Sequence, residues 1–196
     1  MPSENETFIE AARRAQLTDC AAGVIAEVGL GKASMARIAE RAGVSVGVIS
    51  YHFGNKAGLI AAVMTDAAQA AVAMMEPLIV AQSSATLGLR ALITSNLEFM
   101  RLHPERLRAM LEIIQHDNGL YAEQGAQAIT DVQKVLHWGQ QTGEFGDFDT
   151  RVVATSIRAA IDAVPAMLGH VEDLDLTAYG EQLADLFERA TRKETR

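Results

Sequence analysis

Residues 43–59 read GVSVGVISYHFGNKAGL, and the fold of the chain follows from what this stretch can form. It is rich in glycine and β-branched residues, yet it lies between two segments with helical periodicity. Residues 46–53 contain no strong helix former, and Gly47 alone costs about 1 kcal/mol relative to alanine in a helix. Intrinsic helix propensity therefore does not explain the composition of this segment.

The surrounding residues predict a helix-turn-helix. Ser34 is a predicted N-cap for a helix at 35–42, which has one apolar face. Gly43 can adopt the left-handed turn conformation, and Ser45 can cap a second short helix at 46–53. Two short helices joined by such a turn are typical of a helix-turn-helix motif.

A helix that lies in the major groove of DNA has an outer face selected by the duplex. Gly47 would let the backbone approach closely, while Val46 and Val48 can contact thymine methyl groups. Tyr51 and His52 are neutral donors suited to phosphate oxygens, although ordinary half-buried packing is an equal alternative for this pair. The predicted DNA-binding residues are Ser34, Met35, Ser45, Val46, Gly47, Val48, Ser50, Tyr51, His52 and Lys56.

Lys56 occupies an unusual position for a cation. Gly54 is predicted to end the helix before it and Asn55 to cap the next one, which places Lys56 at a helix start. The helix dipole disfavours a cation there by about 0.3–1 kcal/mol, whereas a bound phosphate reverses the sign. The alternative is a lysine that is simply solvated.

These residues resemble the DNA-binding domain of the tetracycline-repressor (TetR-like) family of bacterial transcription regulators. The resemblance covers roughly the first 60 residues and is carried by Ile38-Ala39, Gly43-Val44-Ser45, Gly47, Phe53, Lys56 and Leu59. It implies base or groove contacts at residues 46–48 and phosphate contacts at Ser50, His52 and Lys56. The family commonly has tyrosine where Ser50 stands, and here the Tyr-His pair occupies positions 51 and 52.

Helical periodicity continues through the rest of the chain, without a convincing run of alternating strand residues, so the expected fold class is all-α. About nine helices are expected. They span about 8–28, 35–42, 46–53, 56–78, 84–103, 104–116, 121–141, 150–170 and 176–193. The resemblance implies an N-terminal three-helix DNA-binding domain (8–56, motif about 34–53). A long fourth helix would join it to a C-terminal helical ligand-binding and dimerisation domain (57–196).

The last two predicted helices have apolar faces that suit a symmetric four-helix dimer interface. The alternative is that both helices bury these faces within their own domain. The predicted interface residues are Val153, Ile157, Ile161, Val164, Leu168, Leu183, Leu186 and Phe187. Dimerisation is favoured because one two-turn reading helix binds DNA weakly, whereas a twofold pair reads two half-sites.

An adaptable apolar pocket is a second prediction for the C-terminal part. Eight methionines and one tryptophan in the chain suit such a pocket, although core packing explains each residue more simply. The predicted lining residues are Met74, Phe99, Met110, Ile114, Trp138 and Ile161. The resemblance implies a small-molecule effector there, and the surrounding acid favours neutral or cationic ligands over anions.

Charge is unevenly distributed along the chain, whose net charge is −8. Residues 1–60 hold six basic and six acidic side chains, and residues 34–56 hold three basic against one acidic. A modest positive patch therefore coincides with the predicted motif. No stretch reaches the roughly 18 apolar residues of a membrane helix, which predicts a soluble, cytoplasmic protein without a membrane partner.

Other functional classes have weaker support. The sequence GLGKAS at 29–34 lacks the first glycine of a phosphate loop, and it has alanine where the loop has Ser or Thr after the lysine. The five histidines are scattered singly and Cys20 is the only cysteine, so neither a metal site nor a cofactor is predicted. No catalytic constellation can be assembled.

The sequence thus predicts a homodimeric repressor that binds double-stranded operator DNA and is released when an unknown small-molecule effector shifts the fourth helix. A ligand-controlled activator is the alternative. An all-helical enzyme or an adaptor without a DNA role is a more distant one.

Overall fold

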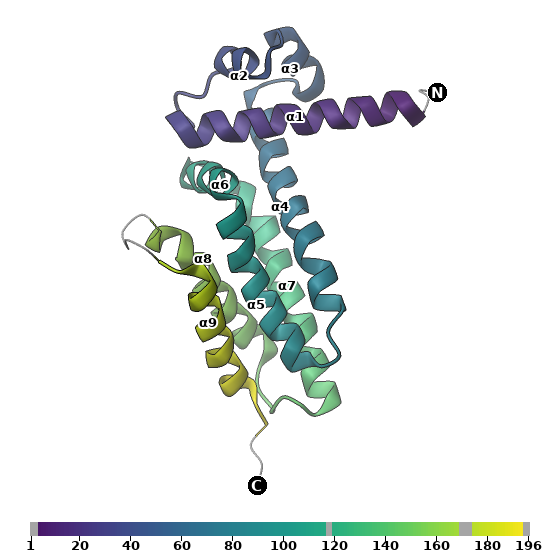
Figure 1. The fold of residues 1–196 in the computed structure, drawn as a ribbon, viewed down its shortest axis with the longest axis vertical. Helices are drawn as coiled ribbons and strands as arrows, with labels where there is room; N and C mark the ends of the chain where they lie inside the picture. The colour runs from purple at the N-terminus through teal and green to yellow at the C-terminus, as the bar shows by residue number, and fades with distance from the viewer. Residues whose placement is uncertain (1–3, 117–118, 169–173, 194–196) are drawn as a thin grey trace. The chain divides into compact units, whose positions relative to one another are not determined.

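The computed structural model describes residues 4–116, 119–168 and 174–193 and confirms the all-α prediction. These residues form nine helices and no β-strand (Figure 1). The helices are α1 (Glu4–Val28), α2 (Met35–Ala42), α3 (Val46–Phe53), α4 (Lys56–Val80), α5 (Ala85–Leu102), α6 (Pro104–His116), α7 (Gly119–Thr142), α8 (Thr150–Met167) and α9 (Leu176–Thr191).

Six helices differ from their predicted bounds, and α5, α8 and α9 are each slightly shorter than predicted. α1 begins at Glu4 instead of Phe8. α4 continues through Pro77 to Val80, since a proline near the end of a long helix removes only one hydrogen bond. α7 begins at Gly119, within the predicted break at 118–120, of which Asn118 lies outside the described residues. Residues 169–170, the predicted end of the eighth helix, also lie outside them.

The predicted caps of the helix-turn-helix are confirmed. The Ser34 hydroxyl accepts from Arg37 N at 3.2 Å, and the Ser45 hydroxyl accepts from Val48 N at 3.4 Å. Asn55 Oδ1 accepts from Gly58 N at 3.0 Å at the start of α4. The helices before these caps end at glycines with left-handed backbone, namely Gly29, Gly43 and Gly54. Local chemistry therefore fixes the ends of these short helices.

The described chain divides into two compact units. The first unit comprises residues up to Gln69 together with Pro104–Tyr121, so it contains α1 to α3, the first half of α4, and α6. Figure 1 shows α2 and α3 on one side of α1 and α6 on the other. Large apolar side chains are buried between these helices, among them Leu17, Ile25, Ile38, Ile49, Leu59 and Ile113.

α4 belongs to both units, because the division falls after Gln69. By length and composition alone it is the one helix in the described ranges that could cross a membrane, contrary to the expectation that no such stretch exists. A single helix of this kind is weak evidence, since core helices of soluble proteins pass the same test. In its first half Leu59 and Val63 are buried in the core, and Asp66 pairs with Arg106 of α6 at 3.3 Å.

The second unit comprises Ala70–His103 and Ala122–Arg196, insofar as these are described. α5 packs against both α9 and α8. Arg90 of α5 is paired with three carboxylates from successive turns of α9, those of Glu181, Asp185 and Glu188. This ion-pair ladder fixes the register of α9 along α5.

The structure corrects part of the predicted dimer interface. Ile157, Ile161 and Val164 of α8 are completely buried within the protomer, and Leu183 of α9 is 8% exposed. These four residues therefore form the core of the second unit and have no surface to offer to another copy. Val153 and Phe187 are half-buried, whereas Leu168 and Leu186 are exposed by 39% and 52%. The alternative of burial within the domain therefore accounts for four of the eight predicted interface residues.

Glu144 links the loop after α7 to the start of α5. Its carboxylate accepts hydrogen bonds at 3.0 Å from Ala85 N and Thr86 N, and also from the hydroxyls of Thr86 and Thr142. Burial alone would raise the pKa of Glu144, but these hydrogen bonds outweigh it and hold the pKa below its ordinary value.

We expect this carboxylate to make the stability of the second unit pH-dependent. A depressed pKa stabilises the fold above the ordinary glutamate value of about 4.3, and the stabilisation is lost as pH falls through the lower folded value. Glu144→Gln should lower the free energy of unfolding by about 1–2 kcal/mol at pH 7 and flatten its decline in acid. Denaturant unfolding between pH 3 and pH 7 measures this. Asp147→Asn, at an exposed position in the same loop, is the control and should change neither.

Candidate nucleic-acid interface

The orientation of α3 is set by one residue. Ile49 is completely buried, whereas Val46 is 42% and Tyr51 79% exposed. None of the ten residues predicted to contact DNA is buried: Ser34, Ser45 and Gly47 are exposed, and Met35, Val48, Ser50, His52 and Lys56 are half-buried. The structure thus presents these residues at the surface of α2, α3 and the start of α4.

Arg14 of α1 supports the end of α3 and was not predicted. Its guanidinium lies 4.6 Å above the centre of the Phe53 ring and donates to the carbonyl of His52. A cation over an aromatic face is attractive, and the hydrogen bond holds the last turn of α3 against α1. The partners are 38 residues apart, so no local pattern could have indicated the contact.

The two aromatic residues of α3 differ in what they can offer. The rings of Tyr51 and His52 meet edge to face at 5.1 Å. His52 Nδ1 is buried without a hydrogen-bond partner, whereas the Tyr51 side chain is largely exposed. Tyr51 is therefore the better placed of the pair to donate to a phosphate oxygen.

Lys56 is held by the backbone of the loop between α1 and α2. Its Nζ donates to Leu30 O at 2.8 Å, and Glu112 Oε2 of α6 accepts from Leu30 N at 3.2 Å. The peptide groups of Leu30 are thus bound by charged side chains of α4 and α6. An ammonium has three N–H donors, so two remain for another acceptor such as a phosphate.

Further basic side chains accompany the motif. Arg37 of α2 and Lys32 before it are exposed and pair with no carboxylate in the described part of the chain, whereas Arg41 pairs with Glu27 at 2.8 Å. Arg37 lies three residues after the Ser34 cap, next to the buried Ile38. The sequence could have indicated the exposure of Arg37, because residues beside the apolar stripe of a short helix face solvent.

Gly47 is not required by the packing of the protein. A Cβ added there would meet only the Ser45 hydroxyl, at 3.5 Å, which is an ordinary contact, and the backbone has no left-handed φ. Gly58 is the opposite case, since its Cβ would lie 2.1 Å from the Phe53 carbonyl oxygen. Gly47 therefore lowers the helix propensity of α3 without being needed for internal packing.

The six predicted pocket residues are divided between the two units. Met110 and Ile114 are half-buried against the core of the first unit. The other four, Met74, Phe99, Trp138 and Ile161, belong to the second unit, where Phe99 and Ile161 are buried. Within the described residues no group of three or more His, Cys, Asp or Glu side chains is arranged to hold a metal ion.

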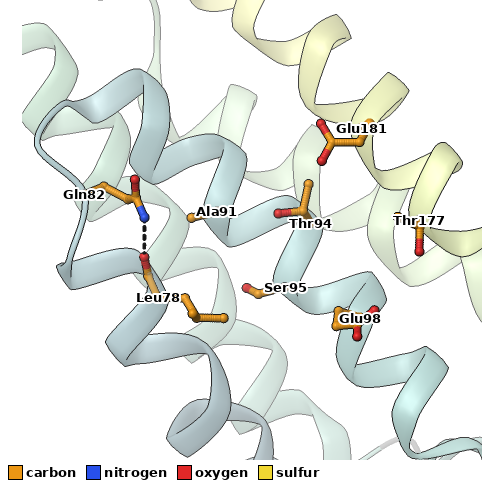
Figure 2. A pocket seen from close by; sticks show the side chains of 8 residues that line it. All are labelled: Leu78, Gln82, Ala91, Thr94, Ser95, Glu98, Thr177 and Glu181. Carbon is orange, nitrogen blue, oxygen red and sulfur yellow. Dashed lines mark hydrogen bonds between the residues drawn. The ribbon is translucent and has the colours of Figure 1, made fainter.

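A cavity of about 320 Å³ in the second unit is lined by other residues. Figure 2 shows Leu78 near the end of α4, Gln82 just after that helix, and Glu98 of α5 and Glu181 of α9 on the other sides. The remaining lining residues are Ala91, Thr94, Ser95 and Thr177. Both carboxylates are already paired with arginines, Glu98 with Arg101 and Glu181 with Arg90.

Comparison with known proteins connects this geometry to a family. Residues 17–63 match the family model described as bacterial regulatory proteins, tetR family. The HTH-type transcriptional regulator BetI of Cronobacter sakazakii is 38% identical over 104 residues, which cover 51% of this chain and 50% of BetI. The chain therefore spans about half the length of the curated relatives it matches.

Solved structures share the fold over almost the whole chain. FadR from Bacillus subtilis, solved in complex with stearoyl-CoA, has a TM-score of 0.80 at 24% identity, covering 87% of this chain and 95% of FadR. A chain from Saccharomonospora viridis, solved in complex with choline, has a TM-score of 0.82 at 20% identity, covering 94% and 100%. At these identities the likeness concerns the fold alone.

Gly47→Ala provides a test of the interface. Alanine should stabilise the protein by about 0.5–1 kcal/mol, because it fits the helix and restricts the unfolded chain. The same change should weaken binding to DNA by keeping the backbone away from the duplex. Thermal unfolding and fluorescence anisotropy with labelled DNA measure the two effects. Gly58→Ala is the control and should destabilise the fold; unchanged DNA affinity in Gly47→Ala would contradict the role of Gly47.

Proposed function

We propose that this chain, a TetR-like DNA-binding transcription regulator, works as a cytoplasmic homodimeric repressor that a small-molecule effector releases from its operator. The observation that carries the proposal is α3 itself. It exposes Val46, Gly47 and Tyr51 while Ile49 anchors it, and its glycine serves no internal packing.

In this proposal α3 lies in the major groove of double-stranded operator DNA. Val46 and Val48 contact base edges, and Gly47 permits the close approach. Tyr51, Arg37 and Lys56 contact phosphates and position the helix.

Release by an effector would act through α4, which belongs to both units, and through α6 of the first unit. α4 runs through both units, and α6 belongs to the first unit although its neighbours in sequence belong to the second. Glu112 of α6 and Lys56 of α4 both bind Leu30, so a shift of either helix changes the loop that carries α2. An effector that prefers the shifted state would populate it. The ligands of the two structural neighbours, stearoyl-CoA and choline, support a small molecule as the signal.

A dimer with two copies of α3 is needed because one two-turn helix covers few base pairs. Leu186 and Val152 are exposed on α9 and α8 of the second unit, beside small residues such as Ala159 and Ala163. An apolar surface lined by small side chains allows helices of a second copy to approach closely.

Selection from a random duplex library with the purified full chain tests the function. The expected result is enrichment of a palindrome whose half-sites lie about one DNA turn apart. Recovery of no common sequence, together with turnover of a metabolite by the same preparation, would favour the enzyme alternative.

Lys56→Ala should separate a phosphate contact from a structural role. Loss of a phosphate contact weakens binding to every sequence and reduces the slope of log affinity against log salt by about 1 per DNA-bound chain. Loss of the bond to Leu30 alone would lower stability and leave that slope unchanged. Anisotropy titrations at several salt concentrations, with Lys193→Ala near the C-terminus as the control, distinguish the two.

Leu186→Glu should disrupt the dimer. An unpaired carboxylate buried between two copies costs several kcal/mol, so the dimer dissociation constant should rise by about 100-fold or more. Sedimentation or light scattering over a range of concentrations measures it. Val80→Glu, at a 74% exposed position on α4, adds the same charge and should leave the assembly unchanged. A dimer of equal strength in Leu186→Glu would place the interface elsewhere.

A further inference from the structure

The cavity of about 320 Å³ in the second unit is lined mainly by groups that accept hydrogen bonds. Two carboxylates, three hydroxyls and one amide line it, together with the apolar side chains of Leu78 and Ala91. Among these eight described residues none is basic and none is aromatic. The cavity therefore offers neither a cation for an anionic ligand nor the aromatic faces that hold a quaternary ammonium group.

Glu98 of α5 keeps acceptor capacity for a ligand. Arg101, one turn further along α5, donates to its two carboxylate oxygens at 2.6 and 2.7 Å, and Arg101 does not line the cavity. A carboxylate has about four lone-pair sites, so acceptor positions remain. The hydrogen bonds from Arg101 hold the pKa of Glu98 below its ordinary value, so this carboxylate is ionised at neutral pH.

Glu181 of α9 belongs to a group with an excess of negative charge. Arg90 is a single cation shared by Glu181, Asp185 and Glu188. Arg189 interacts with Asp185 and offsets only part of the remainder. Glu181 is the member of this group that lines the cavity, and its side chain is 54% exposed. Uncompensated negative charge therefore lies at this wall.

Ser95 of α5 contributes a buried polar group to the same cavity. The residue is 4% exposed, and among the described residues its hydroxyl makes one hydrogen bond, to Leu92 O at 3.4 Å. An ordinary bond between a hydroxyl and an oxygen is about 2.7–2.8 Å long, so this contact is weak. In Figure 2 the hydroxyl points into the space between α5 and Leu78 of α4. A buried hydroxyl so weakly bonded is available to a donor on a ligand.

We infer that this cavity binds a linear diamine, with one protonated amine on Glu98, the other on Glu181, and the methylene chain against Leu78 and Ala91. This inference rests on the proposed function and names the class of its effector. The Ser95 hydroxyl, one turn before Glu98 on α5, accepts from the same ammonium as Glu98. The Glu98 and Glu181 ion pairs with arginine stay in place, because each ammonium uses acceptor positions that the arginines leave open.

Three molecules that share an eight-carbon chain test the class of ligand. Arg90, the partner of Glu181, precedes Glu98 by about two helical turns, or about 11 Å, which an extended chain of this length can span. The molecules are 1,8-diaminooctane, its hexamethylated bis-quaternary form and 1,8-octanediol, each titrated into the full chain by isothermal calorimetry at physiological salt.

The diamine should bind and raise the melting temperature. The bis-quaternary form should bind about tenfold more weakly or less, because it has the same charge but no N–H donor, and the diol should not bind. Equal binding of the two dications, binding of the diol, or binding of none of the three would overturn the inference.

Variants of the lining residues test the location. Glu98→Gln removes a charge and Ala91→Phe fills the cavity, and each should weaken binding of the diamine by about tenfold or more. Glu105→Gln, at an exposed position on α6 in the first unit, removes the same charge and should leave binding unchanged. Equal weakening in Glu98→Gln and Glu105→Gln, or full binding to Ala91→Phe, would mean attraction to net charge only and overturn the site. If Ala91→Phe fails to fold, the comparison of the two glutamine variants decides.

Binding to DNA is measured on the same samples, with Ala91→Phe as the control because diamines also bind DNA phosphates. As an effector, the diamine should weaken DNA binding by the original chain more than DNA binding by Ala91→Phe. Equal weakening, with calorimetric binding intact, would refute the effector role. Diamine binding without any DNA binding would leave the cavity site intact and refute the regulator. DNA binding without calorimetric binding of the diamine would refute the site and leave the regulator intact.

Discussion

The complete burial of Ile49 is the constraint on which the helix-turn-helix formed by α2 and α3 depends. α3 has only eight residues, and fixing one of them in the core also fixes which residues point outwards. α3 has little stability of its own, so contacts at both ends stabilise it. The Ser45 hydroxyl caps its N-terminus, and the Arg14 guanidinium stacks on the Phe53 ring at its C-terminus. The exposed residues of α3 are therefore not determined by internal packing. Gly47 is the clearest example, because a larger side chain there would fit without strain.

Local rules predicted the parts of the fold whose partners lie within a few residues. Ser34, Ser45 and Asn55 cap helices as expected, because a cap needs only a donor three residues ahead. Contacts such as Lys56 with Leu30 could not be predicted, because the loop that carries the carbonyl lies 26 residues away in sequence. The apolar stripe of α8 was recognised correctly as apolar, but periodicity cannot tell a face buried within the protomer from one buried between copies. Ile157 and Ile161 proved to be internal.

Net charge is a poor guide to the chemistry of this molecule. Much of the acid on α9 is paired with a single arginine, Arg90, and Glu98 is paired with Arg101. The pairs of Arg90 hold α9 against α5, whereas Glu98 and Arg101 pair within α5. By contrast, the exposed Arg37 of α2 forms no ion pair with any residue that the structure describes.

The division between the two units falls inside α4, after Gln69, and not in a loop. A flexible linker tolerates changes of length, but a continuous helix does not. Each residue inserted into or deleted from α4 turns everything beyond it by about 100° and moves it by about 1.5 Å. Chimaeras that join the first unit to a different second unit within α4 must therefore be spliced in helical phase.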